Sequence, residues 1–182
     1  MAKSKGARVL RSREVFRGAV FRVTADEVVE PGGIRVRREV VRHTGSVVVL
    51  AIERRQGVDQ ILLERQYRHA AGDFLWEMPA GRIDRGERAL AAAKRELREE
   101  TGYQAAHWER LVTFYPSPGF LSETMTIYLA RGLKRGDAQP ESDEVIRTRW
   151  FSLPDALHMV QTGAIRDGKT ILGVLFKSRS TR

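Results

Sequence analysis

The sequence contains no cysteine and no long apolar run, and each absence excludes a class of protein. Without cysteine there is no disulfide bond and no thiolate, so any metal ion must be held by oxygen or by histidine. The strongest apolar run, residues 46–52, has the length of a strand and is far short of the roughly 20 residues that cross a bilayer. The first thirteen residues are basic and lack an apolar segment, which predicts no secretory signal. We therefore expect a cytoplasmic protein with no membrane partner.

The chain has 182 residues, enough for one well-packed domain, and a formal net charge of +9. Such an excess of positive charge can indicate an anionic partner, either a polyanion or a small phosphate ester. Much of it, however, lies near the two ends of the chain, at Lys3, Lys5, Arg8, Arg11, Arg13, Lys177, Arg179 and Arg182. Charges at chain ends are usually solvated, so we interpret most of the excess as basic tails.

The N-terminal quarter of the chain is predicted to be an extension of the main domain. Residues 1–13 are expected to form a basic, flexible arm, and residues 14–43 an antiparallel β-hairpin. Within that hairpin, residues 15–29 and 34–41 have strand-like patterns, and the Pro-Gly-Gly sequence at 31–33 provides the turn. Residues 44–182 are then expected to form the catalytic domain.

The main domain is predicted to alternate between strands and helices. The β-branched run at residues 46–52 indicates a strand buried on both faces. Further strands are expected at 60–67, 74–78, 108–115, 122–131 and 146–151, and helices at 87–101, 154–162 and 170–177. One helix in the middle of the chain and two at its end fit a mixed α/β sandwich.

The clearest helix spans residues 87–101. Leu90, Ala93, Leu97 and Thr101 recur at helical spacing and form one narrow apolar face. Gly102 follows at once, where glycine most readily adopts the left-handed conformation that ends a helix.

Four carboxylates lie on or beside this helix: Glu87, Glu96, Glu99 and Glu100. Since a helix turns by about 100° per residue, Glu96 and Glu100 are stacked one turn apart, and Glu99 is within reach of the same point. Clustered carboxylates repel one another unless cations neutralise them, and hard oxygen ligands favour Mg²⁺ or Mn²⁺. Arg95 can pair with one of the glutamates and fix its rotamer. The alternative is an ordinary solvated helix face, on which basic neighbours balance the glutamates.

The spacing in residues 81–103 resembles the Nudix box. The matching positions are Gly81, Glu87, Arg95, Glu96, Leu97, Glu99, Glu100 and Gly102. The one departure is Tyr103, an aromatic residue where an aliphatic one is usual, which affects only local packing. The resemblance implies a Nudix-type α/β/α sandwich with a mixed sheet. It further implies that Glu96, Glu99 and Glu100 bind the metal ions, with the carbonyl of Ala80 as a further ligand.

The sequence around the box is similar to the ADP-ribose pyrophosphatase subfamily. The similar segments are RQYR at residues 65–68, EMPAG at 77–81 and SPGF at 117–120. The resemblance implies hydrolysis of ADP-ribose to AMP and ribose 5-phosphate by a homodimer, whose N-terminal hairpin crosses to the partner subunit and helps to bind adenine. Within the fold the alternatives are other nucleoside diphosphate derivatives, such as GDP-mannose, NADH or dinucleoside polyphosphates. Outside that class, the alternative is hydrolysis of RNA 5′ ends or RNA binding, although no stacking pattern of aromatic and basic residues supports a nucleic-acid partner.

The flanking segments supply candidate substrate contacts. The forked guanidinium of Arg68 is suited to a phosphate or to the terminal ribose, and Glu77 could accept hydrogen bonds from adenine or ribose. Phe21 is a candidate for stacking on adenine, and a loop beside the ribose would be shaped by Pro118, Gly119 and Phe120. Each of these residues also has a purely structural interpretation. Arg68 could be a solvated arginine and Glu77 a polar residue at a strand end. Phe21 could be a core aromatic residue, and residues 118–120 a common turn.

A nucleophilic water also needs a base. The resemblance places it on a loop before the last strand, where residues 140–144 are acidic. Glu144 and Glu141 are the candidates, in that order. If Ser142 occupies the position of the base instead, Glu99 or another glutamate of the box must act.

Overall fold

The computed structural model describes residues 6–137 and 145–179, and the chain folds into two compact units. The first unit consists of residues 1–45 and 115–124, and the second of residues 46–114 and 125–182. The chain passes from one unit to the other after residues 45, 114 and 124.

The first unit is built on a three-stranded antiparallel sheet rather than on a two-stranded hairpin. Its strands are β1 (Arg8–Arg17), β2 (Arg22–Val29) and β3 (Arg35–Arg42), in the order β1-β2-β3. The sheet has an additional strand because β1 begins at Arg8, within the segment that the sequence predicts to be a flexible arm. All ten residues of β1 are exposed, so this strand has no burial pattern that a sequence could reveal.

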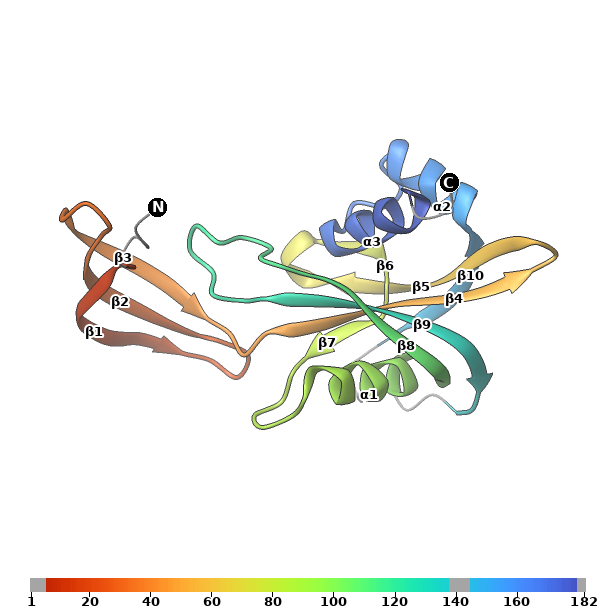
Figure 1. The fold of residues 1–182 in the computed structure, drawn as a ribbon, viewed down its shortest axis with the longest axis horizontal. Coiled ribbons are helices and arrows are strands. Elements are labelled where there is room, and N and C mark those ends of the chain that lie inside the picture. The colour runs from red at the N-terminus through yellow and green to blue at the C-terminus, as the bar shows by residue number, and fades with distance from the viewer. Residues whose placement is uncertain (1–5, 138–144, 180–182) are drawn as a thin grey trace, which may run out of the picture. The chain divides into compact units, whose positions relative to one another are not determined.

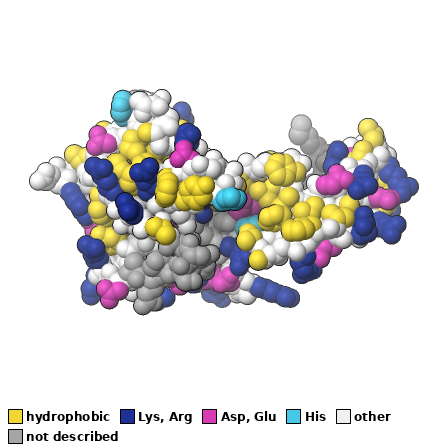
Figure 2. Space-filling view, turned by 180° about the vertical axis from the view of Figure 1, so that it is seen from behind, with side chains coloured by type: hydrophobic (Ala, Val, Ile, Leu, Met, Phe, Trp, Pro, Cys, Tyr) yellow, Lys and Arg dark blue, Asp and Glu magenta, His cyan; other side chains and the backbone are white. Residues whose placement is uncertain are grey.

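The first unit buries a polar group and exposes apolar ones. The Asp26 carboxylate is 2% exposed, accepts a hydrogen bond from Ser12 Oγ and forms an ion pair with Arg42. Large apolar side chains lie on the surface instead: Val9, Leu10, Val15, Phe16, Val20, Phe21 and Ile34 are exposed. Figure 2 shows hydrophobic side chains gathered on one face of this unit. Apolar surface of this kind is typical of an interface.

The second unit contains the main sheet. Its strands are β4 (Ser46–Arg55), β5 (Val58–Arg68), β6 (Asp73–Glu77), β7 (Ala80–Arg82), β8 (Tyr103–Phe114), β9 (Met125–Arg135) and β10 (Arg147–Ser152). The order is β10-β5-β4-β9-β8, with β6 on β5 and β7 on β4. Since β4 and β9 are parallel while the other pairs are antiparallel, the sheet is mixed, as predicted.

Helices cover both faces of this sheet, which confirms the predicted sandwich (Figure 1). One face packs on α1 (Ala89–Thr101), and the other on α2 (Leu153–Gln161) and α3 (Gly168–Arg179). A short 3₁₀ turn, η1 (His69–Ala71), follows β5. None of the helices that the structure describes is both long and apolar enough to span a membrane.

Strand β4 supplies both cores. Val48 and Leu50 belong to the cluster beneath α2 and α3, and the alternating residues Val47 and Val49 belong to the cluster beneath α1. This burial on both faces is what the β-branched run predicts. The sheet therefore provides a rigid support on which α1 and its carboxylates are fixed.

Candidate active site

Helix α1 presents the carboxylates of the site. It buries Ala92, Ala93 and Leu97 against the sheet and ends at Gly102, whose φ of 74° is the left-handed conformation that glycine adopts without strain. The helix begins at Ala89, two residues later than predicted, so Glu87 lies in the preceding turn, where its carboxylate accepts a hydrogen bond from the backbone N–H of Asp84.

Arg95 lies at the centre of these carboxylates and uses all five of its N–H donors. Its Nε and Nη2 donate to Glu87 at 3.1 Å each, and its Nη1 donates to Glu96 at 2.7 Å and to Glu99 at 3.1 Å. The remaining donor, on Nη2, reaches the carbonyl of Arg82 at 3.0 Å. Hydrogen bonding to Glu87 and the charge of Glu96 raise the pKa of Arg95 above its usual value. Arg95 thus orients three glutamates at once.

Strand β7, which precedes the helix, lies against the cluster. Glu100 is 6% exposed, and its Oε2 accepts a hydrogen bond from the backbone N–H of Ala80 at 3.0 Å. A Cβ added to Gly81 would lie 2.0 Å from Glu96 Oε1, so only glycine leaves room for that carboxylate. Residues 80–81 and the glutamates of α1 therefore form one continuous site.

The donor set fits a divalent cation. Glu96, Glu99 and Glu100 offer hard oxygen ligands on one helix, and Ala80 lies against Glu100. Among residues 6–137 and 145–179, no three acidic or imidazole side chains already surround a single point. The guanidinium group of Arg95 is bonded to Glu96 and Glu99. A cation bound there would share these two carboxylates with Arg95.

A second charged group lies on β5 and β6, on the strand pair before the box. Arg68 donates two parallel hydrogen bonds to Glu77, each of 2.9 Å, and Lys169 of α3 forms an ion pair with the same carboxylate. Burial raises the pKa of Glu77, which is 1% exposed, but Arg68 and Lys169 outweigh this effect and hold its pKa below the usual value. Arg68 is therefore not a merely solvated strand arginine.

Lys169 and its neighbours were not predicted to belong to the site. Lys169 also forms an ion pair with Asp167 at 3.0 Å, and Asp167 accepts hydrogen bonds from the backbone N–H and the hydroxyl of Thr170. The Thr170 hydroxyl in turn accepts a hydrogen bond from the backbone N–H of Met78 at 2.8 Å. The start of α3 thus fixes the segment that enters the box, 92 residues earlier in the chain.

Replacing Glu77 with glutamine is expected to lower stability in a pH-dependent way. Because the folded-state pKa of Glu77 is lowered, its contribution is fully present above the unfolded-state pKa of about 4.3. That contribution decreases as the pH falls through the folded-state pKa, so the difference between wild type and Glu77→Gln should shrink in acid. At neutral pH, breaking such a buried pair costs about 3–5 kcal/mol.

Urea unfolding of both proteins between pH 3 and pH 7 measures this difference. Glu53→Gln, which removes an exposed pair with Arg55, is the matched control and should change the unfolding free energy little. A Glu77→Gln difference that does not vary with pH would contradict the assignment of charge to Glu77.

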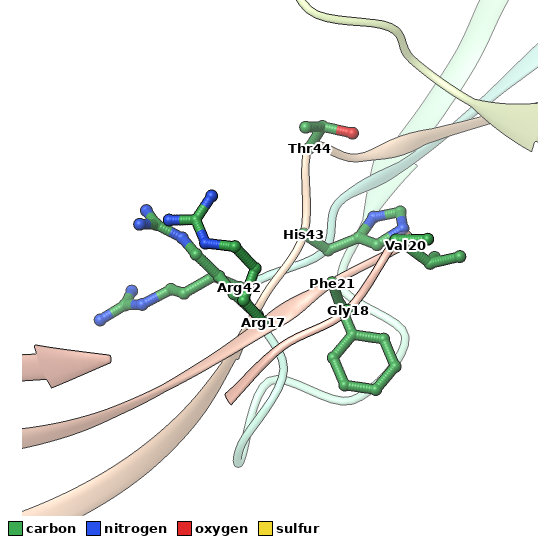
Figure 3. A pocket seen from close by; sticks show the side chains of 9 residues that line it. Arg17, Gly18, Val20, Phe21, Arg42, His43 and Thr44 are labelled. Carbon is green, nitrogen blue, oxygen red and sulfur yellow. The ribbon is translucent and has the colours of Figure 1, made fainter. Parts of the chain in front are cut away.

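Phe21 lines a cavity in the first unit. Figure 3 shows arginine side chains, among them Arg17 and Arg42, extending to one side of this cavity and the Phe21 ring extending to the other. The cavity has a volume of about 230 Å³ and is also lined by His43. Phe21 is 42% exposed and lies 5.8 Å from the ring of Phe16, measured between centroids, so it is not a core residue.

Pro118, Gly119 and Phe120 also lie in the first unit, on the loop that joins β8 to β9. The backbone N–H of Val41 donates to the carbonyl of Phe120 at 2.8 Å, which attaches this loop to β3. Together with Arg38 and Tyr115 they line a cavity of about 470 Å³. The loop is therefore part of a concave surface, although its contact with a substrate stays a prediction.

The two candidates for the catalytic base, Glu141 and Glu144, lie outside the described residues. The choice of the catalytic base among Glu144, Glu141 and Glu99 therefore stays a prediction. Glu99 is fixed by Arg95 and lies 3.9 Å from Arg98.

Comparisons with known proteins show the family of the chain. Residues 42–172 match the NUDIX domain. The chain is 39% identical, over 91% of its length and 80% of the relative's, to an ADP-ribose pyrophosphatase of Mycobacterium tuberculosis (strain ATCC 25618 / H37Rv). It is 35% identical, over 97% of its length and 95% of the relative's, to a methanol dehydrogenase activator of Bacillus methanolicus.

A solved structure shows the same fold. The crystal structure of an ADP compounds hydrolase superimposes with a TM-score of 0.83, covers 96% of this chain and 94% of its own, and is 22% identical in sequence. At that level of identity the likeness shows the fold alone.

Proposed function

The chain belongs to the NUDIX family and is a Nudix hydrolase, and from this premise we propose that it hydrolyses the pyrophosphate bond of ADP-ribose, or of a related nucleoside diphosphate sugar, in the cytoplasm. The observation that supports this proposal most directly is the group of carboxylates on α1, in which Arg95 orients Glu96 and Glu99 and the backbone N–H of Ala80 binds Glu100. The expected products from ADP-ribose are AMP and ribose 5-phosphate.

Nudix hydrolases generally use divalent cations, and we propose Mg²⁺ here, with Mn²⁺ as an alternative. The ligands would be Glu96, Glu99, Glu100 and the carbonyl of Ala80. Bound there, the cation would neutralise phosphate charge and favour deprotonation of a water molecule.

The protein's own residues then have two tasks. Glu96 and Glu99 would hold the cation, while Arg95 keeps its hydrogen bonds to both of them and to Glu87 and so fixes their positions. A carboxylate accepts a proton from the attacking water, and Glu144, Glu141 and Glu99 are the candidates. The new bond joins the water oxygen to one phosphorus, and the bond from that phosphorus to the bridging oxygen breaks.

Candidate substrate contacts are proposed in the second unit and, separately, in the first unit. Arg68 and Glu77 already form a bidentate pair, and a substrate phosphate or ribose could compete for either partner. Phe21 would stack on adenine, and Pro118, Gly119 and Phe120 would border the ribose. Lys169 keeps Glu77 charged in either case, because it pairs with the same carboxylate.

A second candidate function comes from the relative in Bacillus methanolicus, which is named as an activator of a dehydrogenase. Its similarity covers nearly the whole of both chains, so the same activity is open to this protein. Such an activator would act on a dehydrogenase or on a dehydrogenase cofactor, and NADH is one such cofactor that contains a pyrophosphate bond. NADH therefore belongs among the substrates to be tested.

A substrate panel in the presence of Mg²⁺ tests the proposal. ADP-ribose, GDP-mannose, NADH, diadenosine polyphosphates and 5′-triphosphate RNA are compared by kcat/KM, with products separated by chromatography. We expect ADP-ribose to have the highest value. A higher value for NADH would favour the second candidate, and a higher value for RNA would refute the assignment to nucleoside diphosphate sugars.

We also propose that the protein is a homodimer that buries the exposed apolar surface of the first unit. Sedimentation velocity at micromolar concentration should give about twice the mass of one chain. The double variant Val9→Glu, Val15→Glu should sediment as a monomer, because it places two charges in that surface. Val58→Glu, at an exposed apolar position of the second unit, is the control. A monomeric wild type would contradict the proposal.

A further inference from the structure

A cavity between α1 and β8, outside the site described above, has the composition of a nucleotide-binding site. Its volume is about 540 Å³, within the range of small-molecule sites. Lys94, Arg95 and Arg98 of α1 line one side, and Gln104 and Trp108 of β8 line the other. All of these residues belong to the second unit.

The charge of this cavity favours an anion. Its described lining residues include three cations and no carboxylate. Lys94 is exposed and makes no ion pair within the described part of the chain, while Arg98 reaches Glu99 only at 3.9 Å. Lys134 lies directly opposite Gln104 in the sheet and so shares its face, which places another cation nearby. Like charges gathered in one concave surface attract a compact anion such as a phosphate.

The same cavity offers an aromatic surface in a fixed orientation. The Trp108 indole N–H donates to the carbonyl of Ala105 at 3.0 Å, and its ring packs edge-on against Tyr128 at a centroid distance of 6.5 Å. Trp108 is only partly buried, so one part of the ring remains available. Bases stack on such rings irrespective of their identity, and the neighbouring Gln104 amide can donate and accept hydrogen bonds.

This cavity is distinct from the carboxylate cluster. Arg95 borders both, but its five donors are all used by Glu87, Glu96, Glu99 and the Arg82 carbonyl. A ligand in the cavity would therefore be bound by Lys94 and Arg98 rather than by the donors of Arg95. The ligand would nevertheless lie next to Arg95, the side chain that orients the glutamates of the candidate active site.

We propose that this cavity is a second nucleotide site, which binds a nucleoside monophosphate with its phosphate on Lys94 and Arg98 and its base against Trp108. The site does not depend on the hydrolytic reaction. Its existence can be measured in the absence of Mg²⁺ and of any substrate.

The test uses the indole N–H signals of the full chain in nuclear magnetic resonance. The protein has three tryptophans, and the signal of Trp108 is assigned by Trp108→Phe. Titration with AMP is expected to shift the Trp108 signal saturably. The double variant Lys94→Glu, Arg98→Glu should lose this shift, since it places two negative charges against the phosphate.

The matched control is Arg54→Glu, Arg85→Glu, which makes the same change of charge at exposed positions outside the cavity and should retain the shift. A Trp108 signal that does not move, or that moves equally in the Lys94→Glu, Arg98→Glu variant, would overturn the proposal. A shift of Trp76 alone, the residue next to Glu77, would also overturn it, because AMP would then bind only at the candidate active site. An equal shift with inorganic phosphate would refute stacking of the base on Trp108.

Discussion

Replacing Glu100 with glutamine is expected to reduce kcat for ADP-ribose hydrolysis by more than about 100-fold. Loss of a residue that only orients a metal ligand costs roughly 10–100-fold, and Glu100 is proposed as a ligand itself. Glu100 is buried, and its Oε2 accepts a hydrogen bond from the backbone N–H of Ala80. Glutamine can keep that hydrogen bond through its own oxygen, so the fold should survive while the negative charge is lost. The variant should also need a higher concentration of Mg²⁺ for half-maximal activity.

The measurement is a steady-state rate over a range of Mg²⁺ concentrations, with the thermal unfolding midpoint as a check on folding. Glu109→Gln, at an exposed position of β8, is the control that changes the same charge away from the cluster. If Glu100→Gln retained wild-type activity at limiting Mg²⁺, Glu100 would not be a ligand, and the role assigned to the α1 carboxylates would have to be withdrawn.

The second large effect is expected from Gly81→Ala. The new Cβ would lie 2.0 Å from Glu96 Oε1 and 2.1 Å from Glu96 Cδ, distances that unbonded atoms do not adopt. Because the obstacle is the end of a flexible side chain, Glu96 can rotate away, and the fold is expected to persist. Rotation breaks the 2.7 Å contact with Arg95 and displaces a metal ligand, so the activity should fall on the order of 10²-fold.

Gly168→Ala is the matched control, since a Cβ at that position meets no atom within 4 Å. Steady-state kinetics and a circular-dichroism melt of both variants separate loss of activity from loss of structure. A fully active Gly81→Ala variant would show that the activity does not depend on the present position of Glu96. An unfolded variant would show that Glu96 cannot rotate away from the new Cβ.

The candidate metal site could be predicted from the sequence because it lies within one helix and its preceding loop. Spacing at 3.6 residues per turn places Glu96, Glu99 and Glu100 within one turn of α1, while their joint binding of a metal ion stays a prediction. Gly102 ends the helix where predicted, with a φ of 74°. The unusual Tyr103 packs edge-on against Trp150 at a centroid distance of 5.7 Å, which is a local adjustment, as the resemblance to the box implies.

The remaining features depend on contacts that sequence spacing cannot show. Lys169 pairs with Glu77 across 92 positions, and only the fold reveals that α3 reaches the box. Strand β1 was missed for the opposite reason, because an edge strand that is exposed on both faces has no hydrophobic alternation. The cavity at Trp108 combines a helix face with a strand face, so neither segment alone suggests a site.

The central claim is that the carboxylates of α1 support hydrolysis of a pyrophosphate bond. Its most direct test is the reaction of ADP-ribose with the wild-type protein and Mg²⁺ in ¹⁸O-labelled water, followed by mass spectrometry of the products. We predict equal amounts of AMP and ribose 5-phosphate, with one ¹⁸O atom in the phosphate of one product, and no reaction when Mg²⁺ is chelated. Cleavage at any bond other than the pyrophosphate, or cleavage that continues unchanged without a divalent cation, would contradict the account.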